Sequence, residues 1–417
     1  MRSPLRKFFL AAVCLIFAGT CLYSALRMYL AARLAANQDP PSLQRAIQLE
    51  PSNAEYRNVL GRYLASSGQD VDAGISDYEA AIRLNPYVAR YWLDLAGAYQ
   101  VLDRTSEQRQ AVEHALQVDP TSPHVAWEAG NFFLVQGDPD RALREFRVVL
   151  ANDPEAVDSA LLLCWRVTED ANKILDQVLP PKSDLYLSFL RLLIKKQQTA
   201  AAETVWNHLV ALDQPFSPRL AFPYFRLLID QHEVEAAKKA WQQVAALDPS
   251  LRPYLPSAEN LVVNGGFEKD VLNGGFDWWY AQRPHAVVAL DANERHRGMR
   301  SLSVTFDGQS TPDAGIVQFI PVKPNTDYEF SAEYKTESLE SASGPRFMVT
   351  DAYTNASYVL TDDFLDTNPW RLVTAEFKTG PDTNLLLLKI ARDPARPLIK
   401  GRLWIDDVTL VERTDNH

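Results

Sequence analysis

The sequence predicts a multidomain protein that consists of an N-terminal transmembrane helix, an all-α helical solenoid and an all-β sandwich. Three observations predict this fold class: an uncharged apolar stretch near the N-terminus, prolines at a nearly fixed interval in the first half, and short alternating strands in the last part. The 417 residues suffice for two or three domains, and 47% hydrophobic content is typical of globular proteins rather than disordered ones.

The apolar stretch covers residues 8–26, which carry no charged side chain and follow Arg2, Arg6 and Lys7. At about 1.5 Å per residue, a helix of this length spans a hydrocarbon core of about 30 Å. The basic residues favour a cytoplasmic tail at residues 1–7 and a bulk outside the cytoplasm, with a bacterial inner membrane and periplasm as the expected setting. The rival interpretation is a cleaved signal sequence.

A linker helix is expected at residues 27–41 and helical repeats at residues 42–257. Prolines follow the ends of amphipathic segments at positions 51, 86, 120 and 154, in steps of 35, 34 and 34 residues, and again at 181, 215 and 249, in steps of 34. A proline ends one helix and is tolerated in the first turn of the next. The single irregular step, of 27 residues from Pro154 to Pro181, predicts a shortened unit.

Small and bulky residues recur four positions apart before these prolines, which places them on one helix face where neighbouring helices pack. The pairs are Gly74 with Tyr78, Ala142 with Phe146, Ala237 with Trp241 and, one residue out of phase, Ala202 with Trp206. The second unit departs from this pattern, because Gln108 stands where the small residue is expected before Val112.

The period and these residue types resemble the tetratricopeptide repeat, and the third unit matches best, with Gly130, Phe133, Gly137, Ala142, Phe146 and Pro154. The resemblance implies a concave surface that binds protein partners. Most of the tryptophans in the repeats are expected in the core; they are Trp92, Trp127, Trp165, Trp206 and Trp241. No Lys/Arg cluster recurs at one repeat position, so a clamp for acidic peptide tails is not predicted.

A β-sandwich is expected at residues 258–413, followed by a tail at 414–417. The helical period stops near residues 253–256, and short runs bounded by Gly, Pro, Asn and Asp take over. The expected strands are 286–290, 301–306, 315–320, 328–334, 347–351, 371–377, 385–390 and 403–411. About eight to ten short strands without an intervening helix predict an antiparallel sandwich.

Five segments of this region, in this order, are similar to jelly-roll carbohydrate-binding modules of the family 4/9 type. They are residues 260–268, 298–304, 322–328, the tryptophan at 370 and residues 404–410. The resemblance implies a jelly roll that binds glycan, although the same sandwich serves other purposes. It also assigns Trp370 and Trp404 to packing in the core.

A structural calcium site is expected at Glu268 and Asp406. Alternation puts Asp406 on one face of the last strand with Trp404, Val408 and Leu410. A carboxylate on an apolar face is costly unless it is paired or binds a cation, and the resemblance implies calcium. The alternative is that Asp406 caps backbone amides or lies at the edge of the domain.

Saccharide binding requires aromatic rings for stacking and polar groups for hydroxyls. The candidate residues are Asp351, Tyr353, Asn355, Tyr358 and Asp363, together with Trp279 from a second aromatic cluster at 278–280.

Several functions are disfavoured by composition. A net charge of −11 and a pI of about 5.2 argue against nucleic acid. The three cysteines, Cys14, Cys21 and Cys164, leave no disulfide framework in the β-region. The sequence has none of the common hydrolase, nucleotide-binding or zinc-protease motifs, so we expect a protein that is not an enzyme.

The sequence therefore suggests a membrane-anchored scaffold whose repeats bind protein and whose sandwich binds glycan, in polysaccharide or cell-envelope assembly. The alternative is a pure protein-interaction or assembly factor whose sandwich binds no sugar. Exposed rings in the 351–364 region favour the first hypothesis, and buried rings favour the second.

Overall fold

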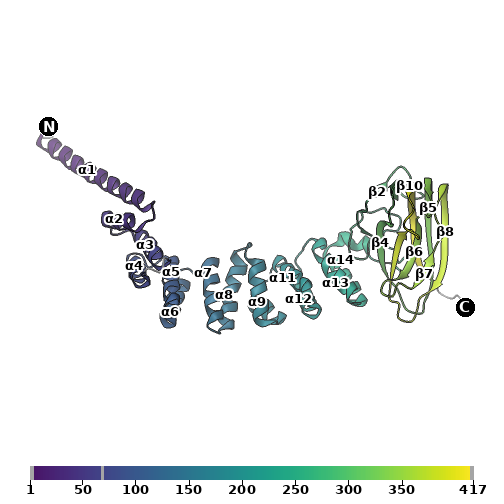
Figure 1. The fold of residues 1–417 in the computed structure, drawn as a ribbon, viewed down its shortest axis with the longest axis horizontal. Coiled ribbons are helices and arrows are strands. Elements are labelled where there is room, and N and C mark those ends of the chain that lie inside the picture. The colour runs from purple at the N-terminus through teal and green to yellow at the C-terminus, as the bar shows by residue number, and fades with distance from the viewer. Residues whose placement is uncertain (1–3, 67–69, 414–417) are drawn as a thin grey trace. The chain divides into compact units, whose positions relative to one another are not determined.

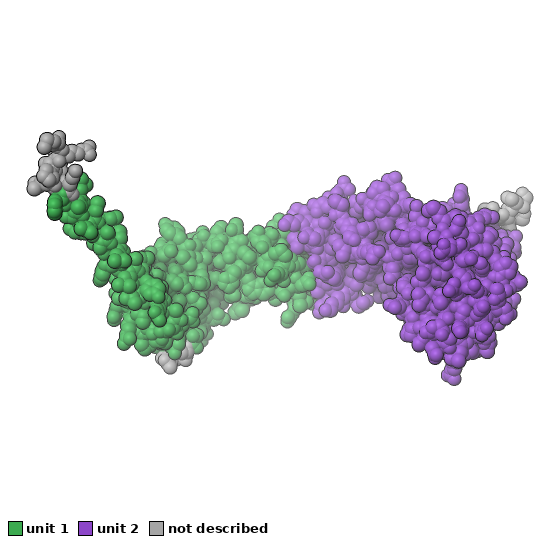
Figure 2. Space-filling view, turned by 90° about the horizontal axis from the view of Figure 1, so that it is seen from above, with its two compact units in different colours: residues 1–180 green, residues 181–417 purple. Residues whose placement is uncertain are grey.

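The computed structural model describes residues 4–66 and 70–413, and it shows an apolar N-terminal helix, a series of helical hairpins and a two-sheet antiparallel sandwich (Figure 1). The predicted fold class is confirmed. The chain divides into two compact units, Met1–Pro180 and Pro181–His417 (Figure 2). This division falls within the helical region, and the domain boundaries expected from the sequence stay predictions. Arg2 and the expected tail at 414–417 lie outside the described residues.

The first helix, α1, runs over Pro4–Ala35 and is apolar through most of its length. Its segment Phe8–Ala35 has 28 residues and a mean hydropathy of 2.1, which is long and apolar enough to cross a membrane, as a signal sequence near an N-terminus also is. The last turns of α1 pack against the next helices, because Ala31 is fully buried in a cluster with Ala46 and Tyr56.

The first unit continues as a series of helices. Their bounds are α2 Pro40–Leu49, α3 Ala54–Ser66, α4 Val71–Leu84, α5 Ala89–Val101, α6 Thr105–Val118, α7 Pro123–Val135, α8 Pro139–Asn152, α9 Val157–Thr168 and α10 Ala171–Gln177. Pro86 and Pro120 lie in the turns between hairpins, as the spacing predicts. Helix α10 has only seven residues, which accounts for the irregular step of 27.

Close contacts between paired helices explain the small residues of the repeat. A Cβ atom added to Gly61 in α3 would lie 2.9 Å from the carbonyl oxygen of Gly74 in α4. The bulky partners Tyr78 and Phe146 are buried, as predicted. Of the repeat tryptophans, Trp165, Trp206 and Trp241 are buried, whereas Trp92 and Trp127 are half-buried.

The second unit begins with two further hairpins. Their elements are α11 Ser183–Lys195, α12 Thr199–Ala211, the 3-10 turn η1 Pro218–Ala221, α13 Phe222–Asp230, α14 Val234–Leu247 and the 3-10 turn η2 Pro249–Tyr254. Aromatic rings fill the space between these helices. Trp206 stacks on Tyr224 with centroids 4.9 Å apart, and Phe225 meets Trp241 edge-on at 5.2 Å.

The sandwich has two five-stranded antiparallel sheets among the described residues. The strands are β1 Trp279–Tyr280, β2 Ala286–Asp291, β3 Ser301–Asp307, β4 Asp313–Pro321, β5 Asp327–Ser341, β6 Arg346–Asp351, β7 Ser357–Leu360, β8 Asp366–Lys378, β9 Leu385–Ala391 and β10 Ile399–Glu412. The first sheet has the order β1-β4-β9-β6-β7 and the second the order β2-β3-β10-β5-β8. Every strand expected from the sequence is present, and the short strands β1 and β7 are additional.

The face assignment in the last strand, β10, was wrong. Its register shifts between Asp406 and Thr409, so the alternation of residues restarts there. The core holds Leu403, Ile405, Val408 and Leu410. Trp404 therefore lies on the outer face of the second sheet. Trp404 is packed, as expected, with 3% of its surface exposed, but it lies outside the cluster between the two sheets; Trp370 is half-buried and also lies outside that cluster.

Candidate functional site

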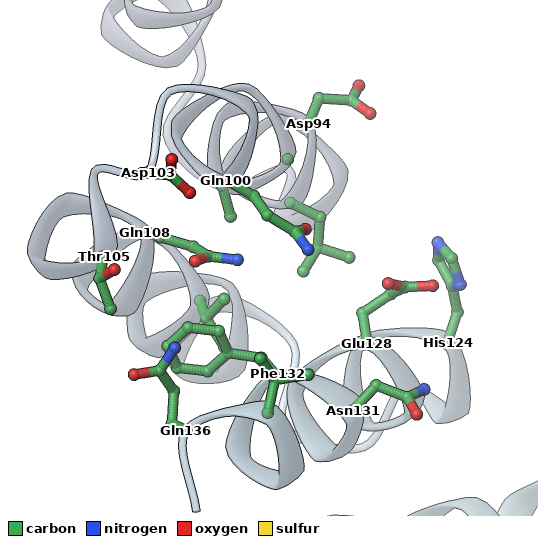
Figure 3. Close-up of a pocket in the computed structure, with 15 residues that line it drawn as sticks. Asp94, Gln100, Asp103, Thr105, Gln108, His124, Glu128, Asn131, Phe132 and Gln136 are labelled. Carbon is green, nitrogen blue, oxygen red and sulfur yellow. The ribbon is translucent and has the colours of Figure 1, made fainter.

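A groove of about 720 Å³ lies between α5, α6 and α7 in the first unit (Figure 3). Its walls carry polar side chains from all three helices, and Gln100 from α5 and Gln108 from α6 both point into it. Phe132 from α7 and Val112 from α6 supply apolar surface. Gly97 on α5 has no atom within 4 Å of the position that a Cβ would take, so this wall is open. The groove can therefore hold an extended segment with both polar and apolar side chains.

The charge of the groove is one-sided. Asp94, Asp103 and Glu128 line it, and the lining residues include no Lys or Arg. Asp94 accepts a hydrogen bond from Asn58 at 2.9 Å and lies 3.5 Å from Arg62. Glu128 is exposed beside His124 on α7. The electrostatic potential of this arrangement favours cationic groups on a ligand.

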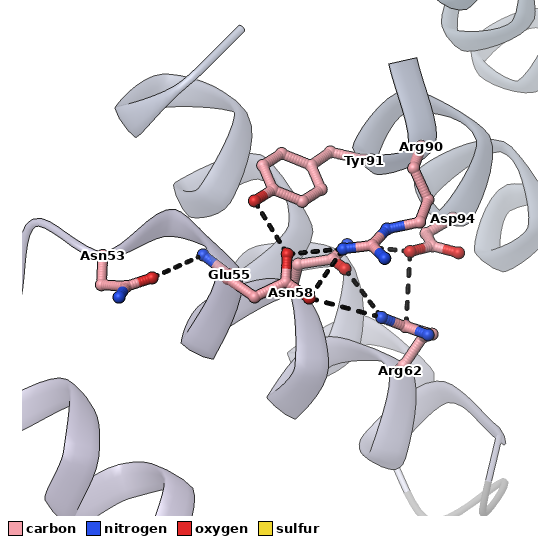
Figure 4. A network of polar contacts seen from close by, with 7 residues as sticks. All are labelled: Asn53, Glu55, Asn58, Arg62, Arg90, Tyr91 and Asp94. Carbon is pink, nitrogen blue, oxygen red and sulfur yellow. Dashed lines mark hydrogen bonds and ion pairs between the residues drawn. The ribbon is translucent and has the colours of Figure 1, made fainter. Parts of the chain in front are cut away.

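A polar network fixes α3 against α5 at one end of the groove (Figure 4). Arg90 donates to both carboxylate oxygens of Glu55, which also accepts from the hydroxyl of Tyr91 at 3.0 Å. Burial raises the pKa of Asp94, while the hydrogen bond from Asn58 opposes that rise. The network thus holds Asp94 in place at the edge of the groove.

Sequence reasoning did not single out these groove residues, although one signal was present. Gln108 breaks the small-residue pattern of the repeat, and the structure places its amide in the groove rather than between packed helices. A polar residue that replaces a packing residue in one unit alone is a sign of a binding surface. The remaining groove residues look like solvated positions in the sequence.

In the second unit, α13 covers part of the outer face of the first sheet. The guanidinium carbon of Arg226 lies 5.9 Å from the ring centroid of Trp279 and 5.5 Å from that of Phe319. Thr350, which alternates with the core residues of β6, is also buried. The indole nitrogen of Trp279, a sugar candidate, donates to the carbonyl of Gly275 at 2.9 Å. This part of the sheet faces helix rather than solvent.

Tyr353, the central sugar candidate, contacts the same hairpin. Its ring stacks on His232 with centroids 3.8 Å apart, and its hydroxyl donates to the carbonyl of Ile229 at 3.0 Å. Burial raises its pKa to about 12. One face of the ring and the hydroxyl are therefore already occupied by the protein itself.

The other candidates around Tyr353 also have intramolecular partners. Asp351 is buried and accepts from the backbone nitrogens of Tyr353 and Thr354 at 2.8 and 2.7 Å. Asn355 is exposed in the same turn, with a φ of 59°. Tyr358 on β7 is linked to Asp351 through Thr383: its hydroxyl lies 2.7 Å from that of Thr383, which donates to Asp351 Oδ2 at 2.7 Å.

Asp363 and Phe364, in the same region, also have intramolecular partners. Asp363 forms an ion pair with Arg346. Phe364 is buried and stacks on Tyr334 at 3.9 Å. The structure thus brings Asp351, Tyr353 and Asn355 into one turn, links Tyr358 to that turn through Thr383, and leaves Asp363 and Trp279 apart. Their role in saccharide binding stays a prediction, and the rings of the region are mostly covered.

Glu268 and Asp406 both lie beside Gly266 at one corner of the sandwich. A Cβ added to Gly266 would lie 3.8 Å from Asp406 Oδ1 and 3.9 Å from Glu268 Cγ. Asp406 Oδ2 accepts from the backbone nitrogens of His296 and Arg297 at 2.9 and 3.1 Å, and Glu268 Oε1 accepts from that of Met299 at 2.8 Å.

Burial raises the pKa of Asp406, although these backbone hydrogen bonds oppose the rise. Among the described residues, no group of three or more His, Cys, Asp and Glu side chains is arranged to hold a metal. The pair would have to be completed by backbone oxygens, which are ligands that calcium accepts. The donor types fit a hard cation, and calcium at this corner stays a prediction.

Two family models match the chain. Residues 41–87 match the tetratricopeptide repeat, and residues 259–395 match the carbohydrate-binding domain of the family 4/9 type. The chain joins a tetratricopeptide repeat region to a carbohydrate-binding domain. Both resemblances predicted from the sequence are confirmed.

The individual proteins that resemble this chain share low sequence identity with it or match only a small part of their length. The general transcriptional corepressor ssn6 of Schizosaccharomyces pombe is 31% identical over 136 residues, which are 32% of this chain and 12% of that relative. A solved CBM4 domain is 15% identical, with 36% of this chain and 99% of that one covered at a TM-score of 0.29. The solved structure of PilF of Pseudomonas aeruginosa is 17% identical. The match covers 55% of this chain and 91% of that one, at a TM-score of 0.25.

Proposed function

We propose that this chain is a non-catalytic, membrane-anchored scaffold whose α5–α7 groove binds an extended, basic segment of a partner protein and whose sandwich binds glycan. The observation that supports it most directly is the groove of about 720 Å³, which is lined by three carboxylates and by no Lys or Arg. The tetratricopeptide family match supports a protein partner, and the carbohydrate-binding domain match supports a glycan.

The groove chemistry suits an extended peptide. Side-chain amides such as Gln100 and Gln108 can each donate to and accept from a peptide backbone. Phe132 offers apolar contact, while Asp103 and Glu128 attract lysine or arginine side chains. A hydrogen bond or ion pair to an exposed carboxylate contributes about 1 kcal/mol, so each carboxylate can matter measurably to affinity.

The anchor in this proposal is α1. A 28-residue apolar segment exceeds the length that a bilayer core of about 30 Å requires, and its C-terminal turns pack against α2 and α3. Residues 8–26 would then cross the membrane, and the repeats would begin close to its surface. Most of the chain would then lie outside the cytoplasm, and together with a glycan-binding domain this supports a role in the cell envelope.

The test uses detergent-purified full-length protein and an array of synthetic peptides that differ in charge. We expect basic peptides to bind, with affinity falling as salt rises. Glu128→Gln and Asp103→Asn should each weaken binding about fivefold to tenfold. Glu155→Gln is the control, because Glu155 is an exposed carboxylate in the turn between α8 and α9 and does not line the groove. Preference for acidic peptides would refute the proposed partner class.

A second candidate function is a pure protein-assembly factor. The packing of Tyr353 on His232 and of Trp279 beneath Arg226 favours it, because the sandwich then acts as a cap on the last hairpin. The rings in the 351–364 region also support this alternative, because Phe364 is buried and Tyr353 and Tyr358 are half-buried. Saturable binding of a polysaccharide to the full chain would exclude it.

A further inference from the structure

The second sheet presents a row of polar and apolar side chains on its outer face. Core residues Phe330 and Ala332 alternate along β5 with Ser331, Glu333 and Lys335, which therefore point away from the core.

Cross-strand pairing sets the neighbours of these side chains. Glu333 lies between Leu372 on β8 and Asp406 on β10, and Ser331 lies between Thr374 and Thr409. Leu372 is 61% exposed, whereas the Glu333 side chain is 14% exposed, so this face is open to solvent along β8 and Glu333 lies at the inner side of that open strip.

The loop between β2 and β3 lies beside the open strip of this face. His296, from the segment between β2 and β3, lies 5.7 Å from the ring of Trp370 and 3.8 Å from a carboxylate oxygen of Glu333. Its Nδ1 lies 2.7 Å from Asp407. Trp370, Leu372, Glu333 and His296 thus form a ledge with an aromatic ring, an apolar floor and polar groups on two sides.

Hydrogen bonds fix the position of the loop that carries His296. Asp406 accepts from the backbone nitrogens of His296 and Arg297, and Glu268 accepts from that of Met299. The neighbouring side chain of Trp404 is also fixed. Its indole donates to Asp291 at 2.9 Å, and the Lys335 ammonium lies 5.5 Å from its ring centroid. A ledge built on strands and an anchored loop is preorganised for a ligand.

The basic side chains near the ledge are already paired. Lys335 pairs with Glu294 at 2.6 Å and Arg297 lies 3.8 Å from Asp407, so neither is free to select an anionic ligand. Aromatic surface flanked by hydroxyl, carboxylate and imidazole groups matches the alternating apolar faces and hydroxyl edges of a neutral sugar. The first sheet offers less room, because α13 covers Trp279 and Phe319.

We infer that the ledge of Trp370, Leu372, Glu333 and His296 on the second sheet is a binding site for a neutral polysaccharide. Trp370 stacks on a sugar ring, and Glu333 with His296 binds its hydroxyls. This inference rests on the glycan-binding half of the proposed function and moves the site away from the residues that the sequence suggested.

The test is affinity electrophoresis of the detergent-purified full chain in gels that contain hydroxyethyl cellulose, laminarin, galactomannan or alginate. We expect retardation by at least one neutral polymer and none by acidic alginate. Trp370→Ala and Glu333→Gln should each weaken binding at least tenfold, while Trp370→Phe retains part of it. Val287→Ala is the matched control, since Val287 is 65% exposed on β2, the opposite edge strand of the same sheet.

Each result decides between distinct conclusions, provided that thermal unfolding shows every variant to be folded. Binding that survives both ledge substitutions overturns the site and leaves glycan binding by the sandwich intact. Retardation by alginate alone overturns the ligand class. No retardation in any gel overturns this inference together with the glycan half of the proposed function, and leaves the protein-binding groove unaffected.

Discussion

The imidazole ring of His232 stacks on the phenol ring of Tyr353 with centroids 3.8 Å apart, although one residue follows α13 and the other follows β6. The hydroxyl of Tyr353 also donates to the carbonyl of Ile229, the penultimate residue of α13. A residue that looks like a sugar platform in the sequence therefore joins the last helical hairpin to the sandwich. The two parts of this unit should consequently unfold together.

We expect His232→Ala and Tyr353→Ala to be non-additive in the free energy of unfolding. Stacked rings contribute about 0.5 to 1.5 kcal/mol beyond buried area, so the double variant should lose less than the sum of the single losses by about that amount. Chemical denaturation of the four proteins measures this difference. His208→Ala is the control, because His208 lies on α12 and contacts the carbonyl of Thr204 in its own helix. Additivity of His232 with Tyr353 would contradict the structural role of the stack.

Local sequence patterns predicted the helical hairpins and the strands because their causes are local. Pro86 and Pro120 lack the N–H that a continuing helix needs, so they mark turns wherever they stand. The strand segments of the sandwich show period-two alternation that burial of one face requires. The short helix α10 was anticipated for the same reason, from the proline step of 27 residues.

The site residues were harder to predict because their roles depend on distant contacts. Tyr353 sits in a polar, aromatic turn that looks the same whether its ring meets a sugar or His232. The sequence analysis placed Trp404 on the wrong face because the pairing register shifts between Asp406 and Thr409, which resets the alternation. The position of such an irregularity cannot be read from the sequence.

Two glycines should respond in opposite ways to the same substitution. Gly61→Ala places a Cβ 2.9 Å from the Gly74 carbonyl and from Cδ1 of Tyr78, so we expect a loss of about 1 to 3 kcal/mol. Gly97→Ala meets nothing within 4 Å inside α5, so it should gain up to about 1 kcal/mol from helix propensity. Differential scanning calorimetry measures both changes. Equal shifts in Tm would contradict the close α3–α4 contact.

Asp277 should make stability fall as the pH rises through the acidic and neutral range. It is fully buried, and burial raises its pKa from the ordinary 3.8 to about 7. Between these values the unfolded chain has released the proton while the folded chain keeps it, so stability decreases from about pH 4 to about pH 7. Above pH 7 the loss is complete, on the order of a few kcal/mol.

Asp277→Asn removes this titration, so its Tm relative to the natural chain should rise between pH 4.5 and pH 8. Asp351 is the control with the opposite sign. Burial acts to raise its pKa, but hydrogen bonds from Thr354 and Thr383 outweigh burial and hold the pKa below its usual range. Its contribution is present above pH 4 and is lost as the pH falls further, so Asp351→Asn should show a constant deficit between pH 4.5 and pH 8. A flat Asp277→Asn profile would contradict the buried, proton-retaining carboxyl.

Calcium removal tests the corner where Glu268 and Asp406 lie beside Gly266. If the two carboxylates hold the ion, a chelator should lower the Tm of the full chain, and saturating calcium should restore about 2 to 3 kcal/mol of stability at a hundredfold excess over the dissociation constant. Asp406→Asn should abolish the difference between chelated and calcium-loaded protein, whereas Asp407→Asn, whose carboxylate contacts His296, should preserve it.

The competing explanation makes a separate prediction for the same corner. Asp406 already accepts hydrogen bonds from His296, Arg297 and Asp407 nitrogens, which is sufficient to stabilise a buried carboxylate. In that case Asp406→Ala should destabilise the sandwich by about 1 to 3 kcal/mol, because backbone donors lose their acceptor, while the chelator leaves the Tm of the natural chain unchanged. An unchanged Tm would therefore assign both carboxylates to anchoring the loop that carries His296.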